Sequence, residues 1–382
     1  MSAQLPVKTG RVCYRLKTDT RISPFDDPIG EVWVGHQLLG VRQAEAARAA
    51  GLGELVEVEP GQVLERSGVL FPDDMFVARS TLAEFAAQAK GRAVLALPTA
   101  SAFVRTTAAL QGNGEEEGPD GPIHVYDVFH VDAGTQLEEG SRREVVEALR
   151  DKAERVTVDP SERVFAIPMM EHYFGSDLFE IVFALRPALR LRHWMHVLWA
   201  NQTSLGLRWR EIGRPRIALW GLLAILRTLS LDVSRILGKM NSIGPKCMIH
   251  PTAVIEASVL GPGCVIGPHA RVQFSHLGKG VAIQGGGQAF FSVVGDHCMI
   301  SQNCAVNFCT MLPMAASGQP VVQFSILGRK AITVVGGYLM DTHFTHNVKV
   351  FLEGELVDTG ERFLGCALGH RVKIGAGVWI AA

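Results

Sequence analysis

The residues best suited to acid–base chemistry lie near the C-terminal end of the chain. Residues 341–348 read DTHFTHNV and place His343 three residues before His346, with Asn347 directly after it. An imidazole titrates near neutral pH and can take a proton from an attacking amine or hydroxyl. We therefore expect His346 to act as a general base. His343 and Asp341 are close enough in the sequence to assist or orient it, and Asn347 is expected to have a positioning role. The alternative is that these histidines lie at turns, where they are solvated or stacked on one another.

Two adjacent carboxylates, Asp73 and Asp74, form a second candidate site in the segment FPDDMFV, residues 71–77. A pair of carboxylates at the end of an apolar strand suits a hard cation such as Mg²⁺. The alternative is a solvated turn after Pro72. The seven cysteines show no CxxC pairing, so we expect free thiols that pack as small hydrophobes and bind no metal.

A period of six residues organises the C-terminal third of the chain. A coil of three short strands has this period, because each flat side takes about six residues and points one aliphatic side chain inward. Glycine directly after the inward residue suits a tight corner, where a Cβ would crowd the turn. The alternative is a row of ordinary short strands that share a spacing. The inward residues predicted in this way are Val254, Leu260, Ile266 and Val272, then Val294, Ile300 and Val306, and finally Leu368, Ile374 and Ile380.

Two segments interrupt this period, residues 309–327 and residues 352–364. Insertions in a stacked coil must leave it as loops, so we expect both segments to be expelled. His370 follows the second segment at a predicted coil corner, where an exposed imidazole could face a neighbouring subunit, and it is a further catalytic candidate. The sequence stops within a regular repeat, so we expect a longer native chain or a second subunit over that end.

Residues 1–175 alternate short apolar runs with helical patterns, which predicts an α/β domain with a mostly parallel sheet. The glycine-rich stretch 112–121 predicts a mobile surface loop. Ser80 or Thr81 is placed to cap a helix. The predicted elements are strands at 53–59 and 91–98 and helices at 41–50 and 81–90.

Residues 176–243 form a basic connector that we expect to be helical. Between positions 186 and 239 arginines and one lysine face only two acids, Glu211 and Asp232, and four tryptophans are interleaved. The apolar run 217–226 is shorter than the roughly 20 residues that span a bilayer. We expect the connector to pack its aromatic face on the protein. The alternatives are a basic helix lying in a membrane interface and a surface for another partner.

The N-terminal segment resembles the opening of sugar-nucleotide pyrophosphorylases. Thr20, Arg21, Pro24 and Phe25 match the end of that family's glycine-rich loop, and AAGLGELVEV at 49–58 matches a later element. The resemblance implies a nucleotidyltransferase-like domain that binds a nucleotide-sugar or sugar phosphate, with Thr20 and Arg21 as nucleotide-binding residues.

The same resemblance implies that Asp73 or Asp74 holds Mg²⁺. The chain departs from the family at residues 15–21, where RLKTDTR replaces the glycines. Those glycines let backbone N–H groups approach a triphosphate closely, so their loss weighs against nucleotidyl transfer. The segment 193–202, HWMHVLWANQ, is similar to the family's link between its catalytic and β-helix domains.

Residues 244–382 resemble the left-handed parallel β-helix of hexapeptide-repeat acyltransferases. LGKG at 277–280 and VVGD at 293–296 are similar to segments of the bifunctional uridyltransferase/acetyltransferases, which join the same two domains in the same order. Phe290 stands where those enzymes carry a catalytic histidine, which weighs against their exact reaction. His346-Asn347-Val348 resembles instead the motif of lipid A acyltransferases. The resemblance implies a homotrimer and an acyl-CoA or acyl-carrier thioester as donor.

Composition describes a globular protein, with 47% hydrophobic and 20% charged residues and a formal net charge of −1. This balance argues against nucleic acid as a partner. The N-terminal residues lack the apolar run of a signal peptide, and the odd number of cysteines suits a cytoplasmic setting, with membrane association left to the connector. We expect a transferase that acylates a sugar or nucleotide-sugar. The alternative is a non-catalytic trimeric scaffold or regulatory relative that has lost both sites.

Overall fold

The computed structural model describes residues 12–169, 178–212, 214–228, 232–343 and 345–380. The chain divides into two compact units. The first is built mainly from residues 27–168 and 178–196, and the second mainly from residues 197–382. Each unit has a distinct architecture, an α/β sheet in the first and stacked parallel strands in the second.

The first unit contains a mixed sheet with the strand order β12-β9-β11-β7-β1-β6. β1 runs parallel to β6 and β7, and β12 runs parallel to β9, whereas β11 is antiparallel to both of its neighbours. The predicted mostly parallel sheet is therefore corrected to a mixed one. The strands are β1 (Val12–Leu16), β6 (Leu55–Val58), β7 (Gly68–Pro72), β9 (Ala93–Pro98), β11 (Gly121–Val131) and β12 (Glu154–Thr157).

The α-helices among the described residues of this unit are α1 (Leu39–Ala49), α2 (Arg79–Gln88), α3 (Ala102–Thr107) and α4 (Arg142–Asp151). The predicted strands at 53–59 and 91–98 and helices at 41–50 and 81–90 are confirmed in type and place. The predicted cap of α2 is wrong, because its N-cap residue is Ala78 and no side chain caps it. The Thr81 hydroxyl donates instead to the carbonyl of Pro187 at 2.9 Å.

The glycine-rich stretch 112–121 is a hairpin arm rather than a structureless loop. Residues Glu115–Gly118 form β10, which pairs antiparallel with β11 and turns back at Gly121. Shorter strands complete the unit: β2 (Arg21–Ile22), β3 (Asp27–Pro28), β4 (Trp33–Val34), β5 (Gln37–Leu38), β8 (Met75–Val77), β13 (Glu162–Pro168), β14 (Leu178–Ala184) and β15 (Ala188–Arg190).

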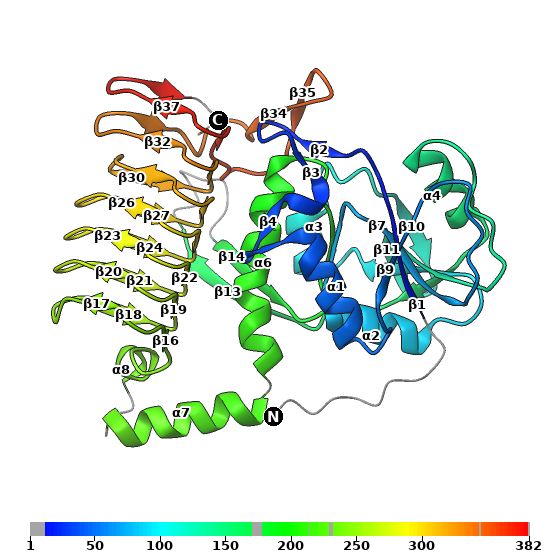
Figure 1. Ribbon diagram of the computed structural model, residues 1–382, viewed down its shortest axis with the longest axis horizontal. Coiled ribbons are helices and arrows are strands. Elements are labelled where there is room, and N and C mark those ends of the chain that lie inside the picture. The colour runs from blue at the N-terminus through cyan, green and yellow to red at the C-terminus, as the bar shows by residue number, and fades with distance from the viewer. Residues whose placement is uncertain (1–11, 170–177, 213, 229–231, 344, 381–382) are drawn as a thin grey trace. The chain divides into compact units, whose positions relative to one another are not determined.

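The second unit is a stack of coils whose short strands form three parallel sheets (Figure 1). The first sheet contains β16 (Ser242–Ile243), β19 (Val259–Leu260), β22 (His276–Leu277), β25 (Val293–Val294), β28 (Thr310–Met311), β31 (Ile326–Leu327) and β36 (Ala367–Leu368). The second contains β17 (Met248–Ile249), β20 (Val265–Ile266), β23 (Ala282–Ile283), β26 (Met299–Ile300), β29 (Ala316–Ser317), β32 (Ile332–Thr333) and β37 (Lys373–Ile374). The third contains β18 (Val254–Glu256), β21 (Arg271–Gln273), β24 (Gln288–Phe290), β27 (Ala305–Asn307) and β30 (Val321–Gln323), and β33 (Tyr338–Leu339) pairs with β38 (Trp379–Ile380).

Most coils of the stack take 17 residues, not the 18 that three sides of six would give, and the coil between Met311 and Leu327 takes 16. The amide of Ser275 donates to the hydroxyl of Ser258, 17 residues earlier, and the amide of Ser292 repeats this contact with Ser275. One side of the coil is therefore a residue shorter than the other two. Val254 was predicted to point inward but is 39% exposed, because its neighbour Ile255 takes the inward position in the shorter side.

Phenylalanines with positive φ form the corner on this shorter side, where a glycine would be expected. Phe274, Phe291, Phe308 and Phe324 have φ between 45° and 52°. Their rings contact one another and Phe290 along the stack, with Phe308 and Phe324 stacked at 4.9 Å between centroids. This aromatic ladder offsets the strain of the left-handed backbone by packing area.

Only one of the two predicted expulsions occurs. Residues 309–327 remain in the stack and supply strands β28 to β31, so that prediction is wrong. The second interruption does leave it: β34 (Lys349–Leu352) and β35 (Glu355–Asp358) form a separate antiparallel hairpin. The amide of Cys366 donates to the hydroxyl of Ser325, 41 residues earlier, where the coil resumes. Residues 340–365 are called the insertion below.

The connector, predicted to be helical over residues 176–243, is helical only from residue 194, because its first part forms the strands β14 and β15. Its described helices are α6 (Trp194–Ile212), α7 (Arg214–Thr228) and α8 (Val233–Leu237). On α6 the side-chain amide of Gln202 donates to the backbone carbonyl of Phe308 at 2.9 Å, which ties the helix to the aromatic ladder. On α7 the side chains of Leu219, Leu222 and Leu226 are 54%, 53% and 59% exposed. No helix in the described ranges is both long enough and apolar enough to cross a bilayer.

Candidate functional site

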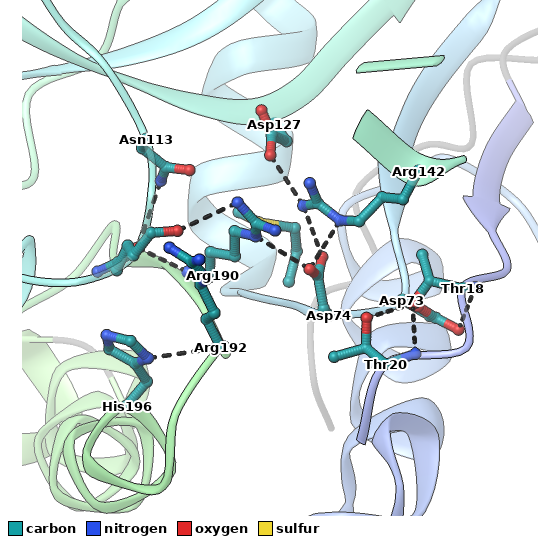
Figure 2. Close-up of polar contacts among 12 residues, drawn as sticks. Thr18, Thr20, Asp73, Asp74, Asn113, Asp127, Arg142, Arg190, Arg192 and His196 are labelled. Atoms are coloured by element: carbon teal, nitrogen blue, oxygen red, sulfur yellow. Dashed lines mark hydrogen bonds and ion pairs between the residues drawn. The ribbon is translucent and has the colours of Figure 1, made fainter. Parts of the chain in front are cut away.

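The first site lies where neighbouring strands of the N-terminal sheet end. Leu16 ends β1 and pairs with Pro72, which ends the parallel strand β7. The residues that follow, Thr18 on one strand and Asp73 with Asp74 on the other, therefore meet at one edge of the sheet (Figure 2). The carboxyl ends of parallel strands are where open α/β sheets bind ligands.

Asp73 is held by the loop that replaces the glycine-rich loop of the pyrophosphorylases. Its carboxylate accepts hydrogen bonds from the amide of Thr18 at 3.0 Å and from the Thr18 hydroxyl at 2.6 Å. The hydroxyl of Thr20 lies 2.8 Å from that of Thr18. Burial raises the pKa of Asp73, and the hydrogen bonds from Thr18 oppose this shift. Arg21 lies in β2, where its side chain is exposed.

Asp74 is only 1% exposed and is engaged by two arginines. Arg142 contacts both of its carboxylate oxygens, at 2.8 and 2.9 Å, and Arg190 donates to one of them at 3.1 Å. Arg142 also donates to Asp127 at 2.8 Å, and Arg150 donates to the other oxygen of Asp127. Figure 2 shows Arg142 reaching both carboxylates.

The electrostatics of this cluster are those of a saturated ion-pair network. Burial opposes ionisation of Asp127, but the charges of Arg142 and Arg150 outweigh it and lower the pKa of Asp127. The same carboxylates raise the pKa of Arg142 against the effect of its burial. A divalent cation at Asp74 would have to displace two guanidinium groups, so this residue does not fit Mg²⁺. Within the described residues, no three His, Cys, Asp or Glu side chains are grouped to hold a metal ion.

His196, near the start of α6, is buried neutral. Its Nδ1 accepts from the amides of Arg192 and His193 at 3.1 and 2.9 Å, and its Nε2 lies 2.9 Å from the carbonyl of Ala109. A carbonyl only accepts, so Nε2 carries the proton. Burial, above all, lowers the pKa of His196 to about 3.

This histidine predicts an acid-sensitive fold. In the unfolded chain the imidazole of His196 is protonated below about pH 6.5, whereas in the folded chain it is protonated only below about pH 3. The free energy of unfolding therefore falls as the pH drops below 6.5. At pH 5 the expected loss is about 2 kcal/mol relative to pH 8. Urea unfolding of the wild type and of His196→Gln across this range measures it. The variant should show a shallower decline, and equal slopes would contradict the assignment.

The second site is the insertion, which brings three predicted residues together. The rings of His343 and His346 lie 4.4 Å apart between centroids. His346 is exposed, and its Nδ1 lies 2.8 Å from the carbonyl oxygen of Asn347. The side-chain amide of Asn347 donates to the carboxylate of Asp358 in the hairpin at 3.2 Å. The imidazole is thereby anchored at the base of the expelled hairpin.

Two acids with raised pKa values flank this motif in the chain. Burial raises the pKa of Glu361 to about 7 and also raises the pKa of Asp341. The carbonyl of Glu361 accepts from the amide of Val348 at 2.8 Å, and the carbonyl of Asp341 accepts from Leu364. The two arms of the insertion that lead into and out of the hairpin are thus tied together, with a carboxyl group on each arm.

His370 lies outside the insertion, at the corner that precedes β37. Its Nδ1 accepts a hydrogen bond from the backbone amide of Arg329 at 2.9 Å, so this nitrogen is bound to the backbone of the preceding coil. Sequence reasoning did not identify Glu361, Asp127 or Arg142. Glu361 stands within a segment already predicted to leave the coil, and that placement was the available signal. The arginines of α4 gave none, because their spacing is that of any solvated helix face.

Comparison with known proteins adds no family assignment. No protein-family model matches the chain, and no curated protein matches it.

Proposed function

We propose that the protein is a transferase of the hexapeptide-repeat type that acylates a sugar or nucleotide-sugar from an acyl-CoA or acyl-carrier thioester. In this proposal the stacked coils are a left-handed β-helix and the first unit is a nucleotidyltransferase-like domain. The supporting observation is the state of His346. Its Nδ1 faces a carbonyl oxygen at 2.8 Å, so Nδ1 carries the proton and Nε2 keeps a lone pair for use as a base.

The proposed step is acyl transfer with His346 as general base. The acceptor amine or hydroxyl attacks the thioester carbonyl, while Nε2 of His346 takes the proton that the acceptor loses. The C–S bond then breaks, and the thiolate leaves with the proton returned by the imidazolium. Asn347, held by Asp358, positions this region of the insertion, and the neighbouring ring of His343, tilted by 33° against that of His346, restricts the orientation of His346.

The N-terminal unit binds without nucleotidyl transfer in this proposal. Thr18 donates hydrogen bonds to the carboxylate of Asp73, and Arg142 and Arg190 form ion pairs with that of Asp74. A non-catalytic scaffold remains the alternative function. Two observations favour it: protein side chains already bind both Asp73 and Asp74, and Phe290, at the position of the family's catalytic histidine, packs into the aromatic ladder.

A homotrimer is part of the proposal and is supported by one face of the stack. On the second sheet, the outward positions are aligned in the register of the strands. They are apolar and exposed at Met248, Val265, Met299 and Ile332, at 65%, 39%, 38% and 37%. A continuous apolar stripe of this kind marks an interaction surface.

Met299→Glu is expected to dissociate the trimer, because it places a charge in the middle of that stripe. Light scattering with size-exclusion chromatography would then give a single-chain mass, against three chains for the wild type. Gln288→Glu, an exposed position on β24 of the third sheet, is the control and should keep the trimer. A single-chain mass for the wild type would contradict this part of the proposal.

Acyl-transfer activity is tested by thiol release. The wild type is incubated with acyl-CoA and acyl-carrier donors and with amino sugars, sugar phosphates or nucleotide-sugars as acceptors. Acceptor-dependent release of the thiol is expected, and its absence with every pair would favour the scaffold. Peripheral membrane contact through the exposed leucines of α7 stays a separate prediction, which co-sedimentation with anionic vesicles tests.

A further inference from the structure

The arginine cluster of the N-terminal unit carries more positive charge than its carboxylates neutralise. Asp74 and Asp127 are both 1% exposed, and three guanidinium groups contact them. Arg142 alone reaches both carboxylates, which leaves Arg150 and Arg190 with one partner each in the pair. An excess of partly buried positive charge is costly unless an anion offsets it.

A short glycine-containing loop, residues 111–114, lies against the outer arginines. A Cβ on Gly112 would sit 3.2 Å from Nη1 of Arg190 and 3.0 Å from Nη1 of Arg192. A Cβ on Gly114 would sit 3.8 Å from Nη1 of Arg150. Gly112 is exposed, so guanidinium groups from two elements approach the surface along this loop.

Polar atoms in the same region are buried without a hydrogen-bond partner. They include Nε of Arg150, Oδ1 of Asn113 and Nε2 of His124. Asn113 and the amide of Arg190 share one acceptor, the side-chain oxygen of Gln111, which places Asn113 beside Arg190 (Figure 2). Groups of this kind are normally satisfied in a folded protein.

His124 is close enough to this cluster to sense it. Burial, first, and then the charge of Arg150 lower the pKa of His124 to about 4. The imidazole is therefore neutral at pH 7. It can give or accept a hydrogen bond there without adding to the positive charge, which the arginines alone supply.

We propose that the N-terminal unit binds the phosphate group of a small molecule between Arg150 and Arg190, beside residues 111–114, without a metal ion. Guanidinium groups match phosphate oxygens in pairs, and the cluster lies at the sheet edge where α/β folds bind ligands. Arginines take the role that Mg²⁺ plays in charge neutralisation. This inference is independent of acyl transfer by the stack, because it concerns binding alone.

The test is thermal stabilisation of the whole protein in the presence of EDTA. Inorganic phosphate, pyrophosphate and uridine diphosphate are the probes, and citrate is the control for a polyanion without phosphate. Stabilisation grows with ln(1 + [L]/Kd), so millimolar concentrations reveal weak ligands. A shift with phosphate alone identifies a free-anion site, whereas a shift with the diphosphates alone identifies a site for a phosphate ester or anhydride.

Three variants locate the binding. Arg150→Gln should weaken it by about tenfold or more, because a charge-assisted hydrogen bond is lost. Gly114→Asp keeps every arginine and places a carboxylate beside Arg150, so it should abolish the shift even if Arg150→Gln fails to fold. Arg143→Gln is the matched control on the same helix, since Arg143 is 84% exposed and pairs only with Glu147 in the described structure. It should leave the shift unchanged.

The outcomes separate cleanly. A shift in EDTA that Gly114→Asp removes and Arg143→Gln keeps supports the proposal. It is overturned if no probe stabilises the wild type, if a shift requires added Mg²⁺, if citrate acts as strongly as the phosphates, or if Gly114→Asp binds as the wild type does. None of these results bears on thiol release, so failure here is distinguishable from failure of the acyltransferase proposal.

Discussion

Arg142→Met is expected to destabilise the N-terminal unit by about 3–5 kcal/mol at neutral pH. The two carboxylates that Arg142 contacts, Asp74 and Asp127, are each 1% exposed and would be left with one partner apiece. Removing one member of a buried ion-pair network costs more than the network contributes, because the remaining charges stay desolvated. Methionine preserves the length of the apolar stem, so the loss reports charge rather than packing.

Urea unfolding, followed by a probe of the first unit, measures this loss, with Arg143→Met as the exposed control. The pH dependence has a definite sign. The depressed pKa of Asp127 contributes stability that is present at neutral pH and lost as the pH falls through that pKa. The difference between wild type and Arg142→Met should therefore shrink on acidification. A variant within 0.5 kcal/mol of the wild type, which is the usual range for a surface substitution, would contradict the network.

His346→Ala is expected to lower acyl transfer by about 10²–10⁴ in kcat/KM, which is the usual contribution of a positioned general base. The side chain is exposed, so the substitution should leave folding and assembly unchanged. Its Nδ1 is anchored on the carbonyl of Asn347, and the loss therefore removes a fixed base.

The control for this prediction is His269→Asn. His269 is a corner residue with φ of 58°, a conformation that asparagine tolerates. Its activity should match the wild type. Loss of activity in both variants would show a general effect on the stack, and full activity of His346→Ala would exclude this residue as the base.

The repeat domain was predictable because its signal is local. Leu260, Ile266 and Val272 follow the interval of six and are all buried. The prediction failed where one side of the coil is shorter, and Val254 was placed inward in error. Phe274 and Phe291, which directly precede the hydrogen-bonded serines Ser275 and Ser292, are separated by the true interval of 17. They were missed because phenylalanine is an unusual choice for a backbone with positive φ.

The N-terminal cluster shows the opposite case. Asp73 and Asp74 are visible as a pair in the sequence, but their partners are distant: Thr18 binds the first from 55 residues away, and Arg190 binds the second from 116 residues away. No pattern along the chain joins such positions, since the sheet order brings them together. The insertion is intermediate, because its departure from the coil is visible in the period, whereas the anchoring of His346 depends on the hairpin that forms.

The most direct test of the account follows the acyl group itself. The wild type is incubated with a ¹³C-labelled acyl thioester and the acceptor panel, and each acceptor is analysed by mass spectrometry. We expect the labelled acyl mass on an amine or hydroxyl of a sugar or nucleotide-sugar, and we expect it to be absent with His346→Ala. Label that remains on the donor, or appears only as the free acid, would contradict it.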